Sequence, residues 1–130
     1  MKNKQVLSVL EMKKLKDLGL NINDASAYYY GGISIKELRW KTGYLKLHPG
    51  YILAYTTDDI LSKLPKNISI EGYLFTLVYC PGSSIMYFDW NNGVTLVEFK
   101  PQSWQVDIDI LFDCLKWCII NKHLEIEKRD

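Results

Sequence analysis

The segment Ser84–Phe99, SIMYFDWNNGVTLVEF, decides the fold class of this chain because it carries a strong β-hairpin signal. Asn92 and Gly93 tolerate the positive φ angles of a two-residue type I′ turn, and apolar residues recur on both sides of them. Pro101 then ends the second strand, since proline has no backbone N–H to donate. The segment therefore predicts two antiparallel strands joined by a tight turn.

The position of the turn sets the register of the hairpin, because residues equally distant from the turn face each other. The predicted pairs are Trp90 with Thr95, Phe88 with Val97, and Met86 with Phe99. We expect all of these residues on one face of the sheet. The opposite face is then mixed and partly exposed to solvent, with Tyr87, Asp89, Leu96 and Glu98.

The segments on either side of the hairpin extend this pattern. Residues 72–80, GYLFTLVYC, are apolar in both alternating sets, which is typical of a central strand covered on both faces. After the hairpin, Ser103 or Asp107 can cap a last helix that continues to about Asn121. The C-terminal half is thus predicted as a sheet followed by a helix.

The first helix is predicted at SVLEMKKLKDLGL, Ser8–Leu20. Ser8 and Glu11 have the spacing of a capping box, in which each side chain accepts a hydrogen bond from the other residue's backbone N–H. Gly19 suits the left-handed conformation that ends a helix, and Leu20 is then placed to contact Leu15, as in a Schellman motif. The buried stripe of this helix is expected to be Met12, Leu15 and Leu18.

A second, shorter helix is predicted in YTTDDILSKLP, residues 55–65. Thr56 or Thr57 can cap it, and Asp58 and Asp59 favour the positive end of the helix dipole. Pro65 ends it. Its expected buried stripe is Ile60, Leu61 and Leu64.

Two further strands are predicted before this helix, in ASAYYYGG at 25–32 and in GYLKLH at 43–48. The segment between them, 33–42, fits a turn of helix or a strand and is left unassigned. The predicted order is αββαβββα. We expect an α+β fold with a mainly antiparallel sheet of about five strands and three helices packed on it.

Composition restricts the function classes. The chain has 130 residues, 48% apolar and 24% charged, which suits a single domain over residues 1–130. The formal net charge of +1 gives no strong field to attract nucleic acid or an anionic membrane. No apolar stretch reaches the ~20 residues that cross a bilayer, and no secretory leader pattern is present. Three cysteines form an odd, sparse set. We expect a cytoplasmic protein without membrane contact.

Cys114, Cys118 and His123 form the best candidate for metal or redox chemistry. A zinc site needs four ligands, often as closely spaced pairs, and no second pair accompanies these cysteines. On a helix their Cβ atoms lie ~5–6 Å apart, too far for a disulfide. We expect both cysteines in the core, His123 beside the last helix carbonyls, and no metal or cofactor.

His48 is the remaining candidate for catalysis, and Asp58 or Asp59 could orient it as a general base. However, no serine or cysteine stands in a nucleophile-elbow pattern, and no glycine-rich phosphate loop occurs. Helix capping explains both aspartates equally well. We expect no catalytic residues, and a small-ligand pocket or hydrolase-like site near His48 is the alternative.

Aromatic and basic residues suggest two kinds of surface. Nine Tyr and four Trp favour an interaction surface, and the run Tyr28, Tyr29 and Tyr30 places rings on both sides of its strand. Whether these rings face solvent stays open. Basic residues gather in two groups, Lys13, Lys14 and Lys16, and Lys36, Arg39 and Lys41. We interpret both groups as solvated faces, with nucleic-acid binding as a second alternative.

The order of three motifs resembles a known group of proteins. The motifs are VLSVLEMKKLKDLGLNINDASAYYY at 6–30, YTTDDILSKLP at 55–65 and LFDCLKWCIINKHLE at 111–125. Within them, Asp24-Ala25-Ser26 and Trp117-Cys118-Ile119 carry the likeness. The chain resembles small gut Bacteroidetes proteins of unknown function, often associated with prophage or other mobile regions. The resemblance implies origin and carries over no functional residues.

The expected function is therefore that of a non-enzymatic accessory protein of a bacterial or phage-derived locus. It would act by binding another protein or a second copy of itself. Aromatic strands and the open edges of a small sheet are the features that would serve such binding.

Overall fold

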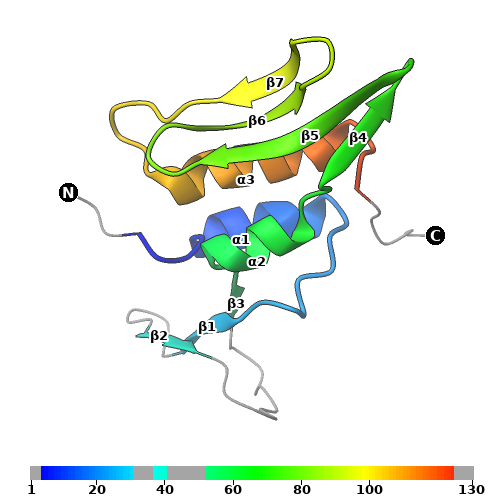
Figure 1. The fold of residues 1–130 in the computed structure, drawn as a ribbon. Coiled ribbons are helices and arrows are strands. Elements are labelled where there is room, and N and C mark those ends of the chain that lie inside the picture. Colours follow the sequence, from blue (N-terminus) through cyan, green and yellow to red (C-terminus); the bar gives the residue numbers. More distant parts are fainter. Residues whose placement is uncertain (1–3, 31–36, 41–51, 125–130) are drawn as a thin grey trace.

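A computed structural model describes residues 4–30, 37–40 and 52–124 of the chain and shows an α+β fold (Figure 1). The elements are α1 (Val9–Asp17), β1 (Ala27–Tyr30), β2 (Glu37–Trp40), β3 (Ile52–Ala54), α2 (Thr57–Lys63), β4 (Asn67–Ile70), β5 (Tyr73–Cys80), β6 (Ser84–Asp89), β7 (Val94–Phe99) and α3 (Asp107–Ile120). The strands form a three-stranded sheet, β2-β1-β3, and a four-stranded sheet, β4-β5-β6-β7, both antiparallel.

The α+β class is confirmed, but the single sheet and the order αββαβββα are wrong. The described part of the chain reads αβββαββββα, with β3 and β4 as strands that the sequence did not indicate. Both are short, and each pairs with a strand that the sequence did indicate, β1 or β5. Pairing across the sheet, rather than local composition, makes them strands.

The three-stranded sheet tests the predictions for the N-terminal half only in part. β1 lies inside the predicted strand at 25–32, and β2 falls in the unassigned segment at 33–42, where Trp40 pairs with Ala27. The strand predicted at 43–48 lies outside the described residues. Tyr28 is buried, and the partly buried Tyr29 donates a hydrogen bond from its hydroxyl to the Leu7 carbonyl, 3.0 Å away. An exposed patch of all three tyrosines is therefore excluded.

Helix α1 begins and ends as its sequence predicts. Ser8 Oγ accepts from Glu11 N at 3.2 Å, and Glu11 Oε1 accepts from Ser8 N at 2.9 Å. At the other end Gly19 adopts φ 98°, and its N–H bonds to Lys16 O. Leu20 N bonds to Leu15 O at 3.1 Å, which completes the Schellman motif.

Helix α2 also has its predicted cap. Thr56 Oγ1 accepts from Asp59 N at 3.1 Å, and the Asp59 carboxylate accepts from Thr56 N at 3.0 Å. The same carboxylate also accepts from the backbone N–H of Ser26, which ties the start of α2 to the segment before β1. The chain then leaves the helix before Pro65.

Helix α3 starts differently from the prediction. Its N-cap is Val106, whose side chain makes no capping hydrogen bond, and neither Ser103 nor Asp107 takes that role. Asp109 accepts a hydrogen bond from Val106 N at 2.9 Å instead, and Asp107 accepts from the Tyr79 hydroxyl at 2.7 Å. The carboxylates near the helix start therefore satisfy backbone and side-chain donors.

The elements stack in layers (Figure 1). The four-stranded sheet lies on α3, α3 packs against α2, and the three-stranded sheet lies beyond α1 and α2. Between these layers one apolar cluster joins both halves of the chain, and its fully enclosed members include Leu7, Met12, Tyr55, Ile60, Ile85, Tyr87, Leu111 and Leu115. All three helices lie on the same side of the four-stranded sheet.

The register of the β6–β7 hairpin corrects the prediction. Asp89 pairs with Val94, so the connection has four residues, 90–93, instead of two. The Asp89 carboxylate accepts hydrogen bonds from Asn91 N at 2.8 Å, Asn92 N at 3.0 Å and Asn92 Nδ2 at 2.8 Å, and these bonds hold the longer loop. Gly93 closes it with φ 67°.

This register splits the predicted face: Met86 and Phe88 lie on one side of the sheet, and Val97 and Phe99 lie on the other. Phe88 pairs with Thr95 and Tyr87 with Val97, and a β-bulge at this point gives Leu96 no opposite partner. Tyr87 and Asp89 are buried, whereas the register predicted from the sequence places them on the partly exposed face.

Candidate functional site

The side of the four-stranded sheet that faces away from the helices carries large apolar residues. Cross-strand partners share a face, so the register places Thr76 beside Phe88 and Val78 beside Met86 on that side. Leu74 and Cys80 follow from the alternation along β5. We call this side the outer face, and its members used below are Leu74, Thr76, Val78, Cys80, Met86 and Phe88, with Trp90 at its end.

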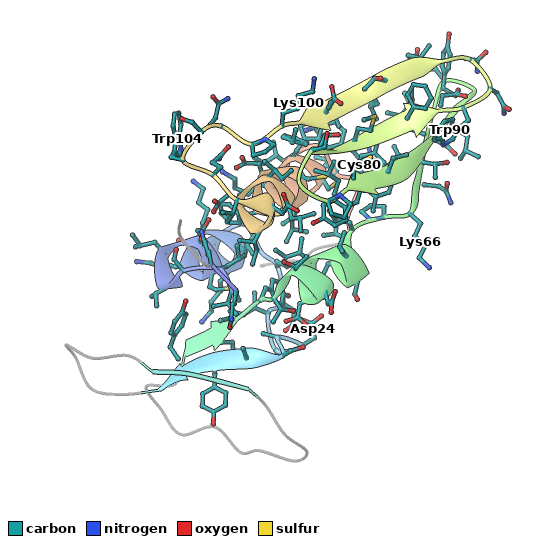
Figure 2. All side chains as sticks on the ribbon, turned by 60° about the vertical axis from the view of Figure 1, so that its left-hand side comes forward. Asp24, Lys66, Cys80, Trp90, Lys100 and Trp104 are labelled. Atoms are coloured by element: carbon teal, nitrogen blue, oxygen red, sulfur yellow. The ribbon has the colours of Figure 1, made fainter. Side chains whose placement is uncertain are left out.

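The outer face is exposed at Leu74 and at Trp90, whereas Met86 and Phe88 are half-buried. Leu74 is 49% exposed and Trp90 is 70% exposed. The Trp90 ring packs edge-on against Phe88 with a centroid distance of 4.9 Å, so the two rings form one aromatic ridge. Figure 2 shows Trp90 at the hairpin tip, away from the helices. No helix within 4–30 or 52–124 covers this ridge.

The opposite side of the same strands, the inner face, is part of the core. Phe75 and Ile85 are 4% and 0% exposed and belong to the apolar cluster. Tyr87 stacks on Trp117 of α3 and donates a hydrogen bond to Pro65 O at 2.7 Å. The sequence predicted a strand at β5 covered on both faces. β5 is central in its sheet, but among the described residues helices cover only its inner face.

Both helical cysteines lie in the core below Tyr87, as the sequence predicts. Cys114 and Cys118 are each 0% exposed, and Cys118 Sγ lies 3.6 Å from the Tyr87 hydroxyl. A hydrogen bond with Cys118, together with burial, holds the pKa of the Cys114 thiol well above its ordinary value. A thiol of this kind is a poor nucleophile. The third cysteine, Cys80, is exposed on the outer face, and all three are free thiols.

Of the two histidines, only His123 belongs to the described residues. His123 packs its ring on Trp117 with a centroid distance of 5.1 Å, and its backbone N–H bonds to Cys118 O at 2.8 Å. The backbone, rather than the imidazole, thus satisfies a last-turn carbonyl. His48 lies outside the described residues. Asp59 serves as the α2 cap and Asp58 is exposed.

The basic groups are described only in part. Lys13, Lys14 and Lys16 are exposed on α1, as a solvated face requires. Lys36 and Lys41 lie outside the described residues, and only the backbone of Arg39 is described, within β2. Whether the two basic groups share a surface therefore lies outside the described residues.

Within residues 4–30, 37–40 and 52–124, the structure was searched for a metal site and for a membrane-spanning helix. This part of the chain contains no cluster of three or more His, Cys, Asp or Glu side chains arranged to hold a metal ion. Among those same residues, no helix is long and apolar enough to cross a membrane.

The sequence does not reveal the outer face, for a physical reason. Alternation shows that both sets of residues in β5 are apolar, but it does not show whether a second layer covers each set. Leu74 and Val78 were therefore expected in the core. The available signal was the aromatic excess, to which Trp90 and Phe88 belong.

Comparison with known proteins yields no relative: no protein family, no curated protein and no solved structure matches this chain.

Proposed function

We propose that this protein is a non-enzymatic, cytoplasmic accessory protein of a bacterial or phage-derived locus that binds another protein chain through the outer face. One observation carries the proposal: the β5 and β6 residues of this face are mostly apolar or aromatic, yet the described helices all lie on the other side of the sheet. Polar residues flank them on the neighbouring strands, Ser69 on β4 and Thr95 and Glu98 on β7. An exposed apolar patch of this kind is typical of an interaction surface.

The composition of the outer face suits protein binding better than ligand binding. Trp90 and Phe88 supply a rigid aromatic anchor, and such residues dominate the energy of protein interfaces. Thr76 and the exposed Asn67 of β4 add polar groups next to this anchor, where their side chains hydrogen-bond to each other at 3.1 Å. A flat strand surface with an aromatic ridge and a polar margin resembles the core and rim of an interface.

The alternatives have less support. A small-ligand or hydrolase-like site depends on His48, which lies outside the described residues, so no observation supports that site. Nucleic-acid binding requires the two lysine groups to share a surface, and only the group on α1 is described. The lysines of the described group lie on α1 and not on the outer face.

Site-specific photo-crosslinking tests the proposal. The photoreactive residue p-benzoylphenylalanine replaces Trp90 or Leu74 on the outer face, and Leu10 on α1 serves as the control. Leu10 is a matched site because it is also apolar and is 78% exposed. The three variants are produced in the cells that naturally make the protein and are irradiated there.

We expect a discrete crosslinked protein species from positions 90 and 74 and none from position 10. The mass of the species distinguishes a second copy of this chain from a different protein. Irradiation without a crosslinked species at 90 and 74, or with equal crosslinking at 10, would show that the outer face is not a binding surface.

A further inference from the structure

The mostly apolar residues of the outer face form a strip that is two strands wide. They lie on β5 and β6, whose register places Thr76 beside Phe88 and Val78 beside Met86. We call this set the apolar strip, and its members are Leu74, Thr76, Val78, Cys80, Met86, Phe88 and Trp90. Polar side chains limit the strip on both sides, because Ser69 of β4 and Glu98 of β7 share this face.

The apolar strip has the width and length of one α-helix. Two neighbouring strands span about 10 Å, and a helix with its side chains has a diameter of about 10–12 Å. From Leu74 to Cys80 the strip runs about 20 Å along β5, a length that about 14 helical residues cover. Helix α3, with 14 residues, covers the opposite side of the same sheet and gives an internal example of this fit.

A helix that covers the apolar strip must be amphipathic. Its side on Val78 and Met86 needs apolar residues, because a polar group without a partner would be desolvated there. Its flanks reach Ser69 and Glu98 and can carry polar residues. Trp90, 70% exposed, stands at one end of the strip and offers an aromatic anchor. An apolar stripe between polar flanks is the pattern of an amphipathic helix.

An extended peptide fits this position less well than a helix. β5 lies between β4 and β6, and β6 lies between β5 and β7, so the backbone of both strands is already paired. An extended peptide laid on this face would therefore bury N–H and C=O groups without partners. A helix satisfies these groups within itself.

A second copy of this chain also fits less well. A stable interface takes roughly 800 Å² from each partner, whereas the strip measures only about 10 Å by 20 Å. Two copies placed face to face would thus bury the polar flanks as well. The three described helices bury their apolar sides in the core and leave Leu10 and Ile120 as their exposed large apolar residues. A helix from a different protein is the better match.

We propose that the apolar strip binds one amphipathic α-helix of a different protein, which lies along β5 and β6. The bound helix gives the four-stranded sheet a helical layer on both faces. This inference rests on the proposed function, since it names the form of the partner at the outer face.

Crosslinks along β5 measure the form of the partner. The residue p-benzoylphenylalanine replaces Leu74, Val78 or Cys80 in three separate variants, which are irradiated in the cells that naturally make the protein. Mass spectrometry then maps the crosslinked residues in the partner. Tyr73 is the control position, because it neighbours Leu74 but lies on the inner face and is 41% exposed.

The spacing of the crosslinked residues tests the helix. Each step of two residues along β5 is about 6.8 Å, the rise of about 4–5 helical residues. We expect the partner residues crosslinked from positions 74 and 80 to lie about 14 residues apart, with the residue crosslinked from position 78 between them. Position 73 should give no crosslink to this segment.

Other spacings overturn the inference. A separation of about 6 residues would mean an extended partner segment. Sites scattered through the partner sequence would mean a folded surface, and sites in a second copy would mean self-association. Each of these results removes the helix and leaves the outer face as a binding surface. No crosslink from any of the three positions removes the proposed function, and the helix with it.

Affinity of the mapped segment gives a second readout. The segment is synthesised with a fluorescent label, and its binding is measured by anisotropy for the wild type, Leu74→Asp and Leu10→Asp, each checked for folding by circular dichroism. Leu74→Asp should weaken binding by at least about tenfold, because it places an unpaired charge under the helix. Leu10→Asp is the matched control, the same change at an exposed leucine of α1, and should bind as the wild type does.

A proline in the middle of the synthetic segment should also weaken binding, since proline interrupts a helix. Equal affinities of Leu74→Asp and Leu10→Asp, or unchanged binding of the proline segment, would contradict the proposed helix.

Discussion

The inner and outer faces of the four-stranded sheet are built from the same strands and similar residues, yet only one is buried. Phe75 on the inner face is 4% exposed, and its chain neighbour Leu74 on the outer face is 49% exposed. Burial of the inner face stabilises the fold through the hydrophobic effect. Folding of the described chain leaves Leu74 and Trp90 of the outer face exposed, and the proposed binding function rests on this difference.

The largest expected difference is in thiol reactivity, between the outer face and the core that the inner face shares with α3. Cys80 on the outer face is exposed, while Cys114 and Cys118 become accessible only when the core opens. Opening of a core costs at least about 5 kcal/mol, so Cys80 should react with a maleimide more than about a thousandfold faster. Mass spectrometry should find a single labelled thiol in the native chain and three after denaturation. Rapid native labelling of Cys114 or Cys118 would contradict the packing.

Truncation of neighbouring residues on β5 should separate the faces in stability. Phe75→Ala should lower the free energy of unfolding by about 3–5 kcal/mol, because it removes an enclosed ring and leaves a cavity. Leu74→Ala should change it by less than about 1 kcal/mol, since the side chain is already half exposed. Urea denaturation followed by fluorescence measures both. Equal losses would mean that the outer face is also part of the core.

Tyr87→Phe tests the polar contact inside the inner face. The substitution removes the hydroxyl that donates to Pro65 O, and loss of this part-buried hydrogen bond should cost about 1 kcal/mol. Tyr73→Phe is the control, because Tyr73 lies on the same face but is 41% exposed. The two variants are compared by chemical denaturation. A loss as large in Tyr73→Phe would show that the Tyr87 hydroxyl has no special role.

The smallest expected effect is the pH dependence of stability that comes from Tyr79, at the end of the inner face. Burial and the hydrogen bond to Asp107 raise the pKa of Tyr79 to about 12. The folded chain thus keeps this proton when the unfolded chain, with a tyrosine pKa of about 10, has lost it. Stability from this group is present below about pH 10 and decreases between about pH 10 and 12. Ultraviolet titration should show a tyrosine transition near pH 12 in the wild type that is absent from Tyr79→Phe. A Tyr79 transition near pH 10 would contradict this contact.

Local hydrogen bonds made the helices predictable. The capping boxes of α1 and α2 join Ser8 to Glu11 and Thr56 to Asp59, each within a few residues, and the Schellman ending at Gly19 is equally local. Such features depend on spacing along the chain, which sequence displays directly. The burial of Cys114 and Cys118 followed from the same helical periodicity.

The hairpin register and the outer face depended on information that periodicity lacks. Two-residue and four-residue loops both fit Asn92 and Gly93, and the hydrogen bonds of Asp89 select the longer loop. With apolar residues on both faces, the shift of register left the hydrophobic pattern nearly unchanged. Strands β3 and β4 are short and are stabilised by pairing with residues elsewhere in the chain.

Protection of Cys80 inside cells tests most directly the claim that the outer face is a binding surface. The rate of N-ethylmaleimide labelling of Cys80 is measured in cells that naturally make the protein and in the purified chain. A Leu10→Cys variant gives the reference rate in both settings. The account predicts that the ratio of the Cys80 labelling rate to the Leu10→Cys labelling rate is lower in cells than in the purified chain. An unchanged ratio would contradict the claim, because the outer face would then be open to solvent where the protein works.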